Sequence, residues 1–273
     1  MQEIQNIYEY PGVAPFRFFI QYGEGDGVYK HPDQHFHPEC ELYVHLEGNV
    51  SFMVEDTVYP VGDGEVILSR PYEYHHCIYH DTSLHRHYWI LISCEGNGAL
   101  FAPFFDRPSG VGNRIVLTPE NSRRLVATCR TLEEAQNMDT LGRYHLFFRL
   151  LSLLADGVSA APRDDEAVLP PDVKTAMEYI DNRLQTGLSI KQLAEAAHTS
   201  INTLERHFRT ALDITPREYM NVRRLTRARE LLSQGLSVQE TCDRCGFPDY
   251  SHFIALFRRR FGITPLQYKL SVQ

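Results

Sequence analysis

The sequence predicts a two-domain α+β protein in which an N-terminal β-barrel or sandwich with flanking helices precedes a domain made only of helices. Two patterns in the 273 residues predict it. Short runs rich in aromatic and β-branched residues, separated by turn signals, fill residues 16–94. From residue 172 onward, helix-start signals alternate with apolar residues at helical spacing.

The charge of the chain is divided in the same way. Residues 1–169 carry 12 basic and 24 acidic side chains, whereas residues 170–273 carry 15 and 11, so the formal net charge of −8 conceals a cationic second part. Such asymmetry suggests nucleic acid as a partner of the second part only. Residues 1–5 do not resemble a secretory signal, and no run approaches about 18 apolar residues. We therefore expect a cytoplasmic protein without a membrane span.

Six short strands are expected in the first part. Turns such as Glu47-Gly48-Asn49 and Gly62-Asp63-Gly64 separate runs of four to six residues. Several short strands at this spacing suggest a small sandwich or barrel. The expected strands are 41–46, 50–54, 57–61, 65–69, 75–79 and 88–93.

Two helices should follow these strands. Thr118-Pro119-Glu120 supplies an N-cap, a first-turn proline and a first-turn acid, and this helix should run to about residue 136. The next helix, over 140–156, has too many apolar positions for one stripe, so it must pack against more than one surface. Either it packs between the protein's own two domains, or it also forms the seam of a homodimer.

Residues 157–171 are small, charged and proline-containing, which is typical of a linker. The expected organisation is a β domain over 1–112, linking or dimerisation helices over 113–156, the linker over 157–171 and an all-helical domain over 172–273.

The all-helical domain contains an internal repeat. Leu188-Ser189-Ile190 returns as Leu236-Ser237-Val238 at an offset of 48, and Ile214-Thr215-Pro216 returns as Ile263-Thr264-Pro265 at an offset of 49. Each copy predicts two helices joined by a short turn, which is the helix-turn-helix arrangement.

The helix starts of this domain are marked by capping residues. Ser200 and Asp249 align as N-caps of the second helix in each copy. Asp172 should cap the first helix of the domain, which should end near Gly187. Capping boxes are expected at Ser189 with Gln192, Thr215 with Glu218, Ser237 with Glu240, and Thr264 with Gln267.

The second helix of each copy should have an apolar face and a polar face. The apolar faces are expected to be Ile201, Leu204 and Phe208 in the first copy, and Tyr250, Phe253 and Phe257 in the second. The polar faces carry side chains that can read base edges in the major groove of double-stranded DNA, asparagine pairing with adenine and arginine with guanine. The expected DNA contacts are Ser200, Asn202, Thr203, Arg206 and Arg209 in the first copy, and Tyr250, Ser251, His252, Ala255, Arg258 and Arg259 in the second.

A family resemblance rests on residues spread over about 100 positions. They are Leu193-Ala194-Glu195, Ser200, Leu204, Arg206, Phe208, Thr215-Pro216, Tyr219, Arg224, Ala228, Leu231-Leu232, Gly246-Phe247, Phe253, Phe257-Arg258, Phe261-Gly262, Thr264-Pro265 and Tyr268. With them, residues 172–269 resemble the DNA-binding domain of the AraC/XylS family of bacterial transcription regulators. The resemblance implies two helix-turn-helix subdomains joined by a helix over 217–233, with both recognition helices in successive major-groove segments on one face of the DNA.

Ala255 departs from the family pattern, which often has a basic or polar residue at this position of the second recognition helix. An alanine methyl can touch a thymine methyl but cannot form a hydrogen bond. We therefore expect the first helix to supply most base specificity, while the second mainly binds phosphate through Arg258 and Arg259.

A second motif lies among the histidines, nine of which fall between residues 31 and 87. His35, His37 and Glu41 are spaced at even steps, so strand alternation would point all three to one face of a sheet. Together with Gly48 they resemble the first half of the cupin signature, and Pro71 with His76 resembles the second half. The resemblance implies a cupin-like barrel in which His35, His37, Glu41 and His76 hold a divalent transition metal.

Other uses of these residues stay open, because Tyr29 and Glu73 stand where the signature has glycine. The sensor domains of AraC-type regulators also commonly keep the pattern without using it for metal. His37 and Glu41 could then form hydrogen bonds within the barrel or line the pocket of a small polar effector. The expected effector-binding residues are His35, His37, Glu41, Tyr43, His76 and Trp89.

These patterns predict a bacterial one-component transcription regulator that is not an enzyme. A small molecule, for which the resemblance suggests a sugar, would bind the cupin-like domain and modulate promoter binding by the double helix-turn-helix. The expected partners are promoter DNA, a second copy of the chain and, if the protein activates, RNA polymerase. No cofactor is required. Two alternatives are a metal- or redox-responsive regulator and a metal cupin enzyme fused to a DNA-binding domain.

The cysteines favour no metal site of their own. Cys242 and Cys245 have CxxC spacing, but no second pair completes a tetrahedral site, so we expect them to pack in the core. All six cysteines are expected to be reduced thiols.

Overall fold

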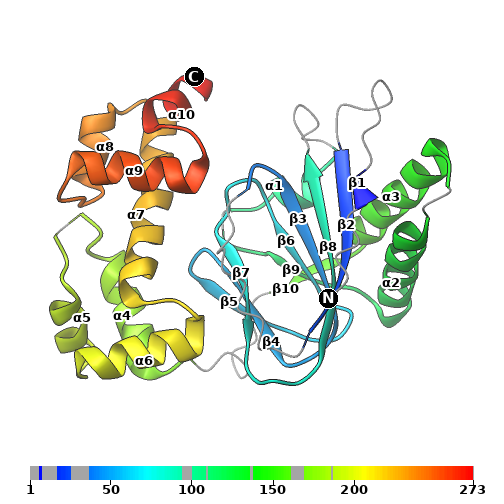
Figure 1. Ribbon diagram of the computed structural model, residues 1–273, viewed down its shortest axis with the longest axis horizontal. Coiled ribbons are helices and arrows are strands. Elements are labelled where there is room, and N and C mark those ends of the chain that lie inside the picture. The colour runs from blue at the N-terminus through cyan, green and yellow to red at the C-terminus, as the bar shows by residue number, and fades with distance from the viewer. Residues whose placement is uncertain are drawn as a thin grey trace. The chain divides into compact units, whose positions relative to one another are not determined.

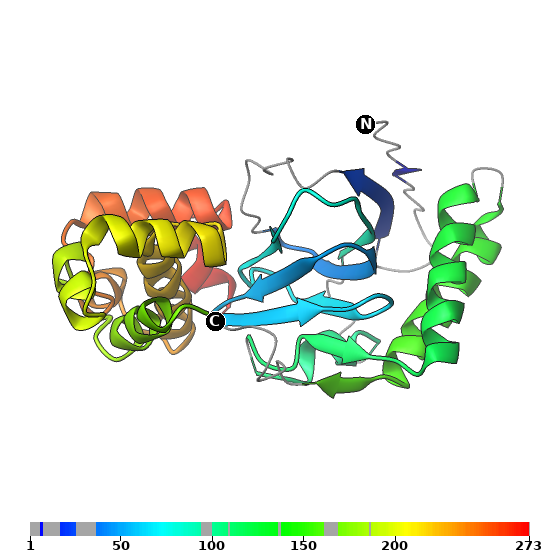
Figure 2. The same cartoon turned by 90° about the horizontal axis from the view of Figure 1, so that it is seen from below.

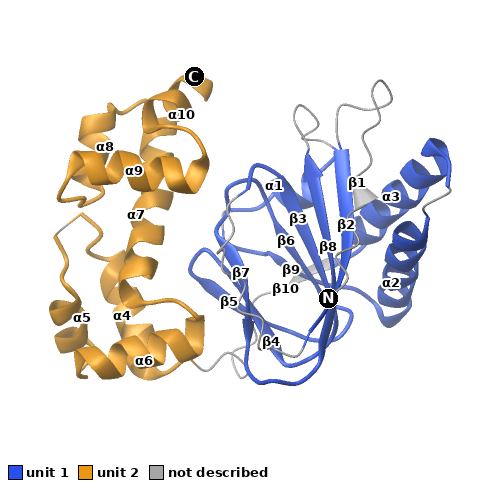
Figure 3. Ribbon diagram, in the orientation of Figure 1, with its two compact units in different colours: residues 1–167 blue, residues 168–273 orange. Residues whose placement is uncertain are grey.

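The computed structural model of the chain divides into two compact units, 1–167 and 168–273 (Figure 3). The boundary falls inside the segment 157–171. The structure describes residues 6–7, 17–25, 37–93, 100–108, 110–135, 138–160, 169–185 and 187–272.

Antiparallel strands of the N-terminal unit form two sheets (Figure 1). The larger sheet has the strand order β1-β2-β8-β3-β6-β9-β10, and the smaller has the order β5-β4-β7. The strands are β1 (Asn6–Ile7), β2 (Arg17–Gly25), β3 (Cys40–Glu47), β4 (Val50–Val54), β5 (Thr57–Val61), β6 (Val66–Ser69), β7 (His75–Tyr79), β8 (His85–Ser93), β9 (Arg114–Val116) and β10 (Val158–Ala160).

All six expected strands are present. β4, β5 and β7 have the predicted bounds, whereas β8 begins three residues earlier than predicted. β1, β2, β9 and β10 were not among the predicted strands, and β10 occupies the start of the segment expected to be a linker. β10 pairs with the free edge of β9, with Ser159 opposite Ile115. This pairing satisfies backbone groups that an edge strand would otherwise expose, a tertiary effect that the local composition does not reveal.

Alternation along β3 gives the larger sheet two different faces. Cys40, Leu42 and Val44 point to a core shared with helices, whereas Tyr43 points to a second core shared with the smaller sheet. The ring of Tyr43 lies 4.8 Å from that of Phe52 on β4. The two sheets therefore face each other as the predicted sandwich, and Glu41, Tyr43 and His45 of β3 are buried on its inner side.

Three helices accompany this sandwich: α1 (Ala102–Phe105), α2 (Pro119–Glu134) and α3 (Thr140–Ala155). Figure 2 shows α2 and α3 side by side, and residues of both belong to the core on the outer face of the larger sheet. Phe147 of α3 stacks on Phe18 of β2 with ring centroids 4.3 Å apart. The prediction that this helix packs against more than one surface is therefore confirmed, since α3 contacts both the larger sheet and α2. Leu141 and Phe148 remain 79% and 42% exposed.

The C-terminal unit consists of helices, with α7 joining two groups of three (Figure 1). They are α4 (Pro171–Asp181), α5 (Ile190–Ala196), α6 (Ile201–Leu212), α7 (Pro216–Ser233), α8 (Val238–Arg244), α9 (Tyr250–Phe261) and α10 (Pro265–Ser271). No helix in the described part of the chain is long and apolar enough to cross a membrane.

The start of α4 differs from the prediction. Its N-cap is Pro170 rather than Asp172, because Pro171 occupies the first helical position, where its fixed φ and missing N–H suit a helix start. Asp172 lies in the first turn, and its carboxylate is 2.7 Å from Nδ1 of His207 on α6. The helix ends at Asp181, before the predicted end near Gly187.

The internal repeat is confirmed by matching caps and turns. All four capping boxes form, and Ser200 and Asp249 cap α6 and α9 as expected. The turns also correspond, since His198 and Gly246 both have positive φ, at 52° and 70°. Each copy therefore has the same helix-turn-helix backbone, although only the second has glycine at the left-handed position.

The cysteines of the described residues form no disulfide, and both members of the CxxC pair, Cys242 and Cys245, are buried in the C-terminal unit. The expected packing role of this pair is confirmed.

Candidate functional site

The two recognition helices, α6 and α9, bury one face and expose the other. Leu204, Phe208, Phe253 and Phe257 are fully buried, as predicted. Ile201 and Tyr250 were predicted on the same buried faces but are 40% and 39% exposed. Each is the first residue of its helix. For Tyr250 this exposure agrees with its other predicted role as a DNA contact.

The predicted DNA contacts lie on the exposed faces of these helices. Two of them also stabilise the start of α6, because the Ser200 hydroxyl accepts a hydrogen bond from the backbone N–H of Thr203. Thr203 is half-buried, and the other predicted contacts are exposed: Ser200, Asn202, Arg206, Arg209, Tyr250, Ser251, His252, Ala255, Arg258 and Arg259.

The guanidinium groups on these faces have no partner among the described residues and are therefore available to a ligand. Arg206, Arg209, Arg258 and Arg259 form no ion pair or side-chain hydrogen bond with any residue that the structure describes. Elsewhere in the unit, arginines of α7 are paired: Arg223 with Asp181 at 2.7 Å and Arg227 with Glu230 at 2.8 Å. Four unpaired cations on the exposed faces of two equivalent helices form a surface suited to a polyanion.

The sequence did not lead us to expect that a fifth arginine, Arg260 of α9, stabilises the fold. It is only 6% exposed, and its guanidinium donates to the Val222 carbonyl oxygen at 2.9 Å and to the Thr226 hydroxyl at 3.2 Å. These bonds tie α9 to α7. The available signal was its position seven residues after Phe253, on the buried face, within a run of three arginines.

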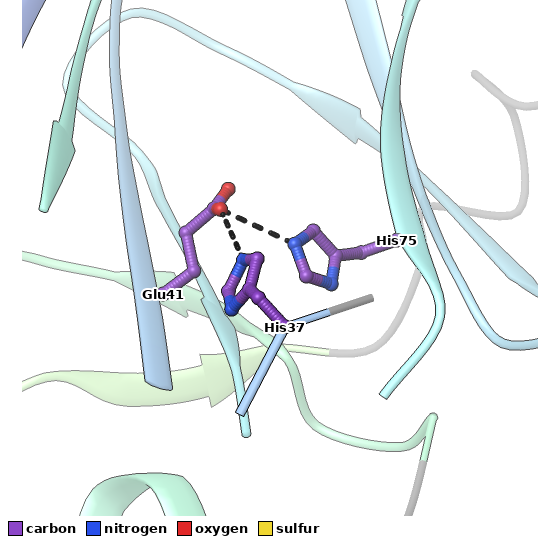
Figure 4. A group of neighbouring side chains, drawn as sticks. All are labelled: His37, Glu41 and His75. Carbon is purple, nitrogen blue, oxygen red and sulfur yellow. Dashed lines mark hydrogen bonds and ion pairs between the residues drawn. The ribbon is translucent and has the colours of Figure 1, made fainter. Parts of the chain in front are cut away.

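A second candidate site lies inside the N-terminal sandwich, where His37, Glu41 and His75 converge (Figure 4). Nε2 of His37 and Nε2 of His75 lie 3.0 and 3.2 Å from the same oxygen, Oε2 of Glu41. One ligand atom from each residue lies within 4.8 Å of the others. Burial alone would raise the pKa of Glu41 and lower that of His75, but their pairing outweighs burial, so the pKa of Glu41 is lowered and that of His75 is raised.

Backbone contacts fix the ring orientation of both histidines. Nδ1 of His37 lies 3.1 Å from the Glu39 carbonyl oxygen, and Nδ1 of His75 lies 2.8 Å from that of Glu73. Carbonyl oxygens only accept hydrogen bonds, so each Nδ1 carries a hydrogen and each Nε2 faces the Glu41 carboxylate, which also only accepts when ionised. Each Nε2 then needs either a second proton or a cation beside the carboxylate. Histidines that bind metal have this arrangement, with the other ring nitrogen donating to a carbonyl.

Two histidines predicted for this cluster are not among its members. His76 was expected, but the structure brings its neighbour His75 to Glu41. Adjacent strand residues point to opposite faces, and the register of β7 on β4, with His75 opposite Val54, turns His75 inward. His35 lies outside the described residues.

Tyr43 and Trp89 lie in a second group of interior side chains. The His87 ring is 5.1 Å from that of Tyr43 and 4.4 Å from that of Trp89. His85 stacks parallel to His87 at 5.6 Å. Four of the predicted effector residues therefore belong to two groups inside the sandwich: His37 and Glu41 to one, and Tyr43 and Trp89, around His87, to the other.

Two glycines of β2 make room for this group, since Gly23 pairs with His87 and Gly25 with His85. A Cβ at residue 23 would lie 2.3 Å from Nε2 of His87, so Gly23→Ala should displace the buried imidazole and lower the free energy of unfolding by about 1–3 kcal/mol. Gly62→Ala, whose Cβ would meet Glu65 at an ordinary 3.6 Å, is the matched control. Urea unfolding followed by tryptophan fluorescence measures the free energy of unfolding of both variants. Equal losses would show that the packing of His87 does not require glycine at residue 23.

Comparison with known proteins gives two family matches. Residues 22–151 match the model of an AraC-like ligand binding domain, and residues 193–271 match that of a helix-turn-helix domain. The first match includes the Glu41 cluster, and the second includes both recognition helices.

Similar proteins are transcription regulators. The HTH-type transcriptional activator RhaS of Escherichia coli O1:K1 is 31% identical over 145 residues, which are 52% of this chain and 51% of RhaS. The Xylose operon regulatory protein of Haemophilus influenzae is 28% identical over 109 residues, 40% of this chain and 28% of that protein. A solved AraC-type regulator from Chromobacterium violaceum is 31% identical, covers 37% of this chain and 92% of its own, and has a TM-score of 0.36. The matched region thus spans about half the length of RhaS and less of the xylose regulator.

Proposed function

We propose that this chain, which belongs to the AraC family of transcription regulators, binds promoter DNA through α6 and α9 and a small molecule inside its N-terminal sandwich. The observation that carries the proposal is the pair of equivalent helices whose exposed faces hold four uncommitted arginines. The small molecule would change the affinity of the C-terminal unit for its promoter. Because promoter DNA is the partner, the proposal places the protein in the cytoplasm.

Selection from random-sequence duplex DNA tests the DNA-binding part of this proposal. The full chain is incubated with the duplex pool at a stated salt concentration, and the bound fraction is amplified and sequenced over several rounds. We expect one enriched site with two parts about one helical turn apart, since each part would meet one recognition helix. A pool that stays random would contradict sequence-specific binding.

A sugar is the proposed class of effector. One similar protein is named for a xylose operon, and the interior of the sandwich combines aromatic rings with hydrogen-bonding groups around Tyr43, His87 and Trp89. A ligand that binds only the folded state raises the unfolding midpoint, so a thermal-shift panel of sugars and sugar acids identifies the effector.

A homodimer and RNA polymerase complete the proposed partners. Leu141 and Phe148 are seven residues apart on α3 and exposed, which supports α3 as the seam between two copies. RNA polymerase would be a partner only if the protein activates transcription.

A metal-responsive regulator is the second candidate function. Two imidazoles and one carboxylate are ligands that divalent transition metals accept, and the Nδ1 contacts leave both Nε2 atoms directed at one point. His37, Glu41 and His75 would hold the metal. The redox-responsive alternative has less support, because burial raises the pKa of both Cys77 and Cys245 to about 12, which keeps these thiols protonated and unreactive.

Zinc binding by neighbouring variants tests this candidate. Full-length protein prepared without an affinity nickel column is titrated with Zn²⁺, and the bound metal is measured by mass spectrometry after dialysis. We expect about one equivalent in the wild type and in His76→Ala, but less than about a tenth in His75→Ala. Wild-type protein with less than about a tenth of an equivalent would exclude the metal function, and retention of zinc by His75→Ala would contradict the ligand set.

A further inference from the structure

The exposed face of α9 contains a hollow that is bounded only by residues of this helix and its C-cap. Its lining is Ser251, Ile254, Ala255, Arg258, Arg259 and Gly262. The hollow exists because residues 251, 255 and 262 are small, whereas Ile254, Arg258 and Arg259 have longer side chains. A longer side chain at residue 255, as the family often has, would fill it.

Contacts on the buried side of α9 fix the orientation of its exposed face. Phe253 and Phe257 are buried against the rest of the unit, and the Arg260 guanidinium is bonded to the Val222 carbonyl and the Thr226 hydroxyl of α7. These contacts prevent α9 from rotating about its axis, so Ala255 is held outward.

The lining of the hollow combines the apolar side chains of Ile254 and Ala255 with two cationic arginines and the hydroxyl of Ser251. The Ala255 methyl and the Ile254 side chain offer no hydrogen bond, and Arg258 and Arg259 supply two uncommitted positive charges. A duplex presents the matching combination in its major groove, where the C5-methyl of thymine is an apolar group on a base edge and phosphates line the rim. No other base has that methyl.

We propose that the hollow at Ala255 receives the C5-methyl of one thymine, so that α9 selects a base by an apolar contact while Arg258 and Arg259 bind the adjacent phosphates. The inference rests on the proposed DNA-binding function and names how its second half recognises sequence. It also changes the expectation that α9 serves mainly as a phosphate contact.

Replacing single thymines by deoxyuridine tests this contact, because the substitution removes only the methyl group. In the duplex selected by the full chain, each thymine is replaced in turn and the affinity is measured by fluorescence anisotropy at fixed salt. At one position in the half-site bound by α9 we expect binding about fourfold weaker, the effect of burying one methyl group.

The variant Ala255→Asn identifies the residue responsible. Asparagine fills the hollow and can pair with adenine, so the variant should become insensitive to deoxyuridine at that position and should prefer adenine there. Residue 255 is exposed, and circular dichroism checks that the helices are retained.

Two failures are distinguishable. If no duplex is selected at all, the proposed function fails. If a site is selected but every thymine in the half-site of α9 tolerates deoxyuridine, or the sensitive thymine remains equally sensitive in Ala255→Asn, then the hollow does not receive a methyl group and only this inference is overturned.

Discussion

Replacing Arg107 by alanine should lower the free energy of unfolding of the N-terminal unit by about 3–5 kcal/mol, the cost of removing one partner of a buried ion pair. The carboxylate of this pair is that of Glu73, which is fully buried. It accepts hydrogen bonds from Nη1 and Nη2 of Arg107 at 2.9 and 2.7 Å, from the Gly110 N–H at 2.7 Å and from the Asn113 amide at 3.0 Å. Arg70, whose Nε lies 3.8 Å from the same carboxylate, is more distant and makes the weaker contact. Burial alone would raise the pKa of Glu73, but its bonds with Arg107 lower it, so the group is ionised and needs the guanidinium.

The matched control for this prediction is Arg86→Ala. Arg86 pairs with Glu24 and Glu47 at 3.0 and 2.9 Å, but all three side chains are at least 40% exposed, so water screens the pairs and the loss should be much smaller than that of Arg107→Ala. The only tryptophan, Trp89, belongs to the N-terminal unit, and its fluorescence during urea unfolding reports on that unit. Similar losses in the two variants would show that the Glu73 network contributes no more than a surface pair.

Arg206→Ala should weaken binding to the selected duplex by about 1–3 kcal/mol, or roughly 5- to 150-fold, and should relax base preference at one position. Arg206 is exposed on α6, one turn from Asn202, and its guanidinium is uncommitted within the described residues. A guanidinium can bind guanine through two parallel hydrogen bonds, which is why the loss should be specific to one base.

Arg206→Lys separates base reading from charge. Lysine keeps the positive charge but lacks the planar fork of arginine, so it should retain the salt dependence of binding and lose much of the base preference. Affinities for the selected duplex and for variants at each position, measured over a range of salt, distinguish the two effects. If Arg206→Ala weakens all sequences equally, Arg206 binds phosphate and the assignment to a base is wrong.

Local signals in the sequence predicted the helices of the C-terminal unit well. Capping pairs such as Thr215 with Glu218 involve neighbours three residues apart, so their geometry is set within one turn and is visible in the sequence. The start of α4 was misplaced because Asp172 is a good N-cap by type, whereas Pro171 and the contact with His207 decided its actual position.

The interior of the sandwich could be predicted only in part. His37 and Glu41 belong to one stretch of chain, and the structure brings them together. The third member depends on the register between β7 and β4, and a register one residue different would have exchanged His75 for His76. The replacement of a signature glycine by Glu73 likewise had no local explanation, because its partner Arg107 lies 34 residues further along the chain.

The separation of buried and exposed faces on α6 and α9 has a consequence for altering the target sequence. Core residues such as Phe208 and Phe257 are buried in each half, while Arg206 and Ala255 are exposed. Exposed helix substitutions usually change stability by about 0.5 kcal/mol or less. Single substitutions on either exposed face should therefore change the target sequence of that half without unfolding it, and the two halves can be altered independently.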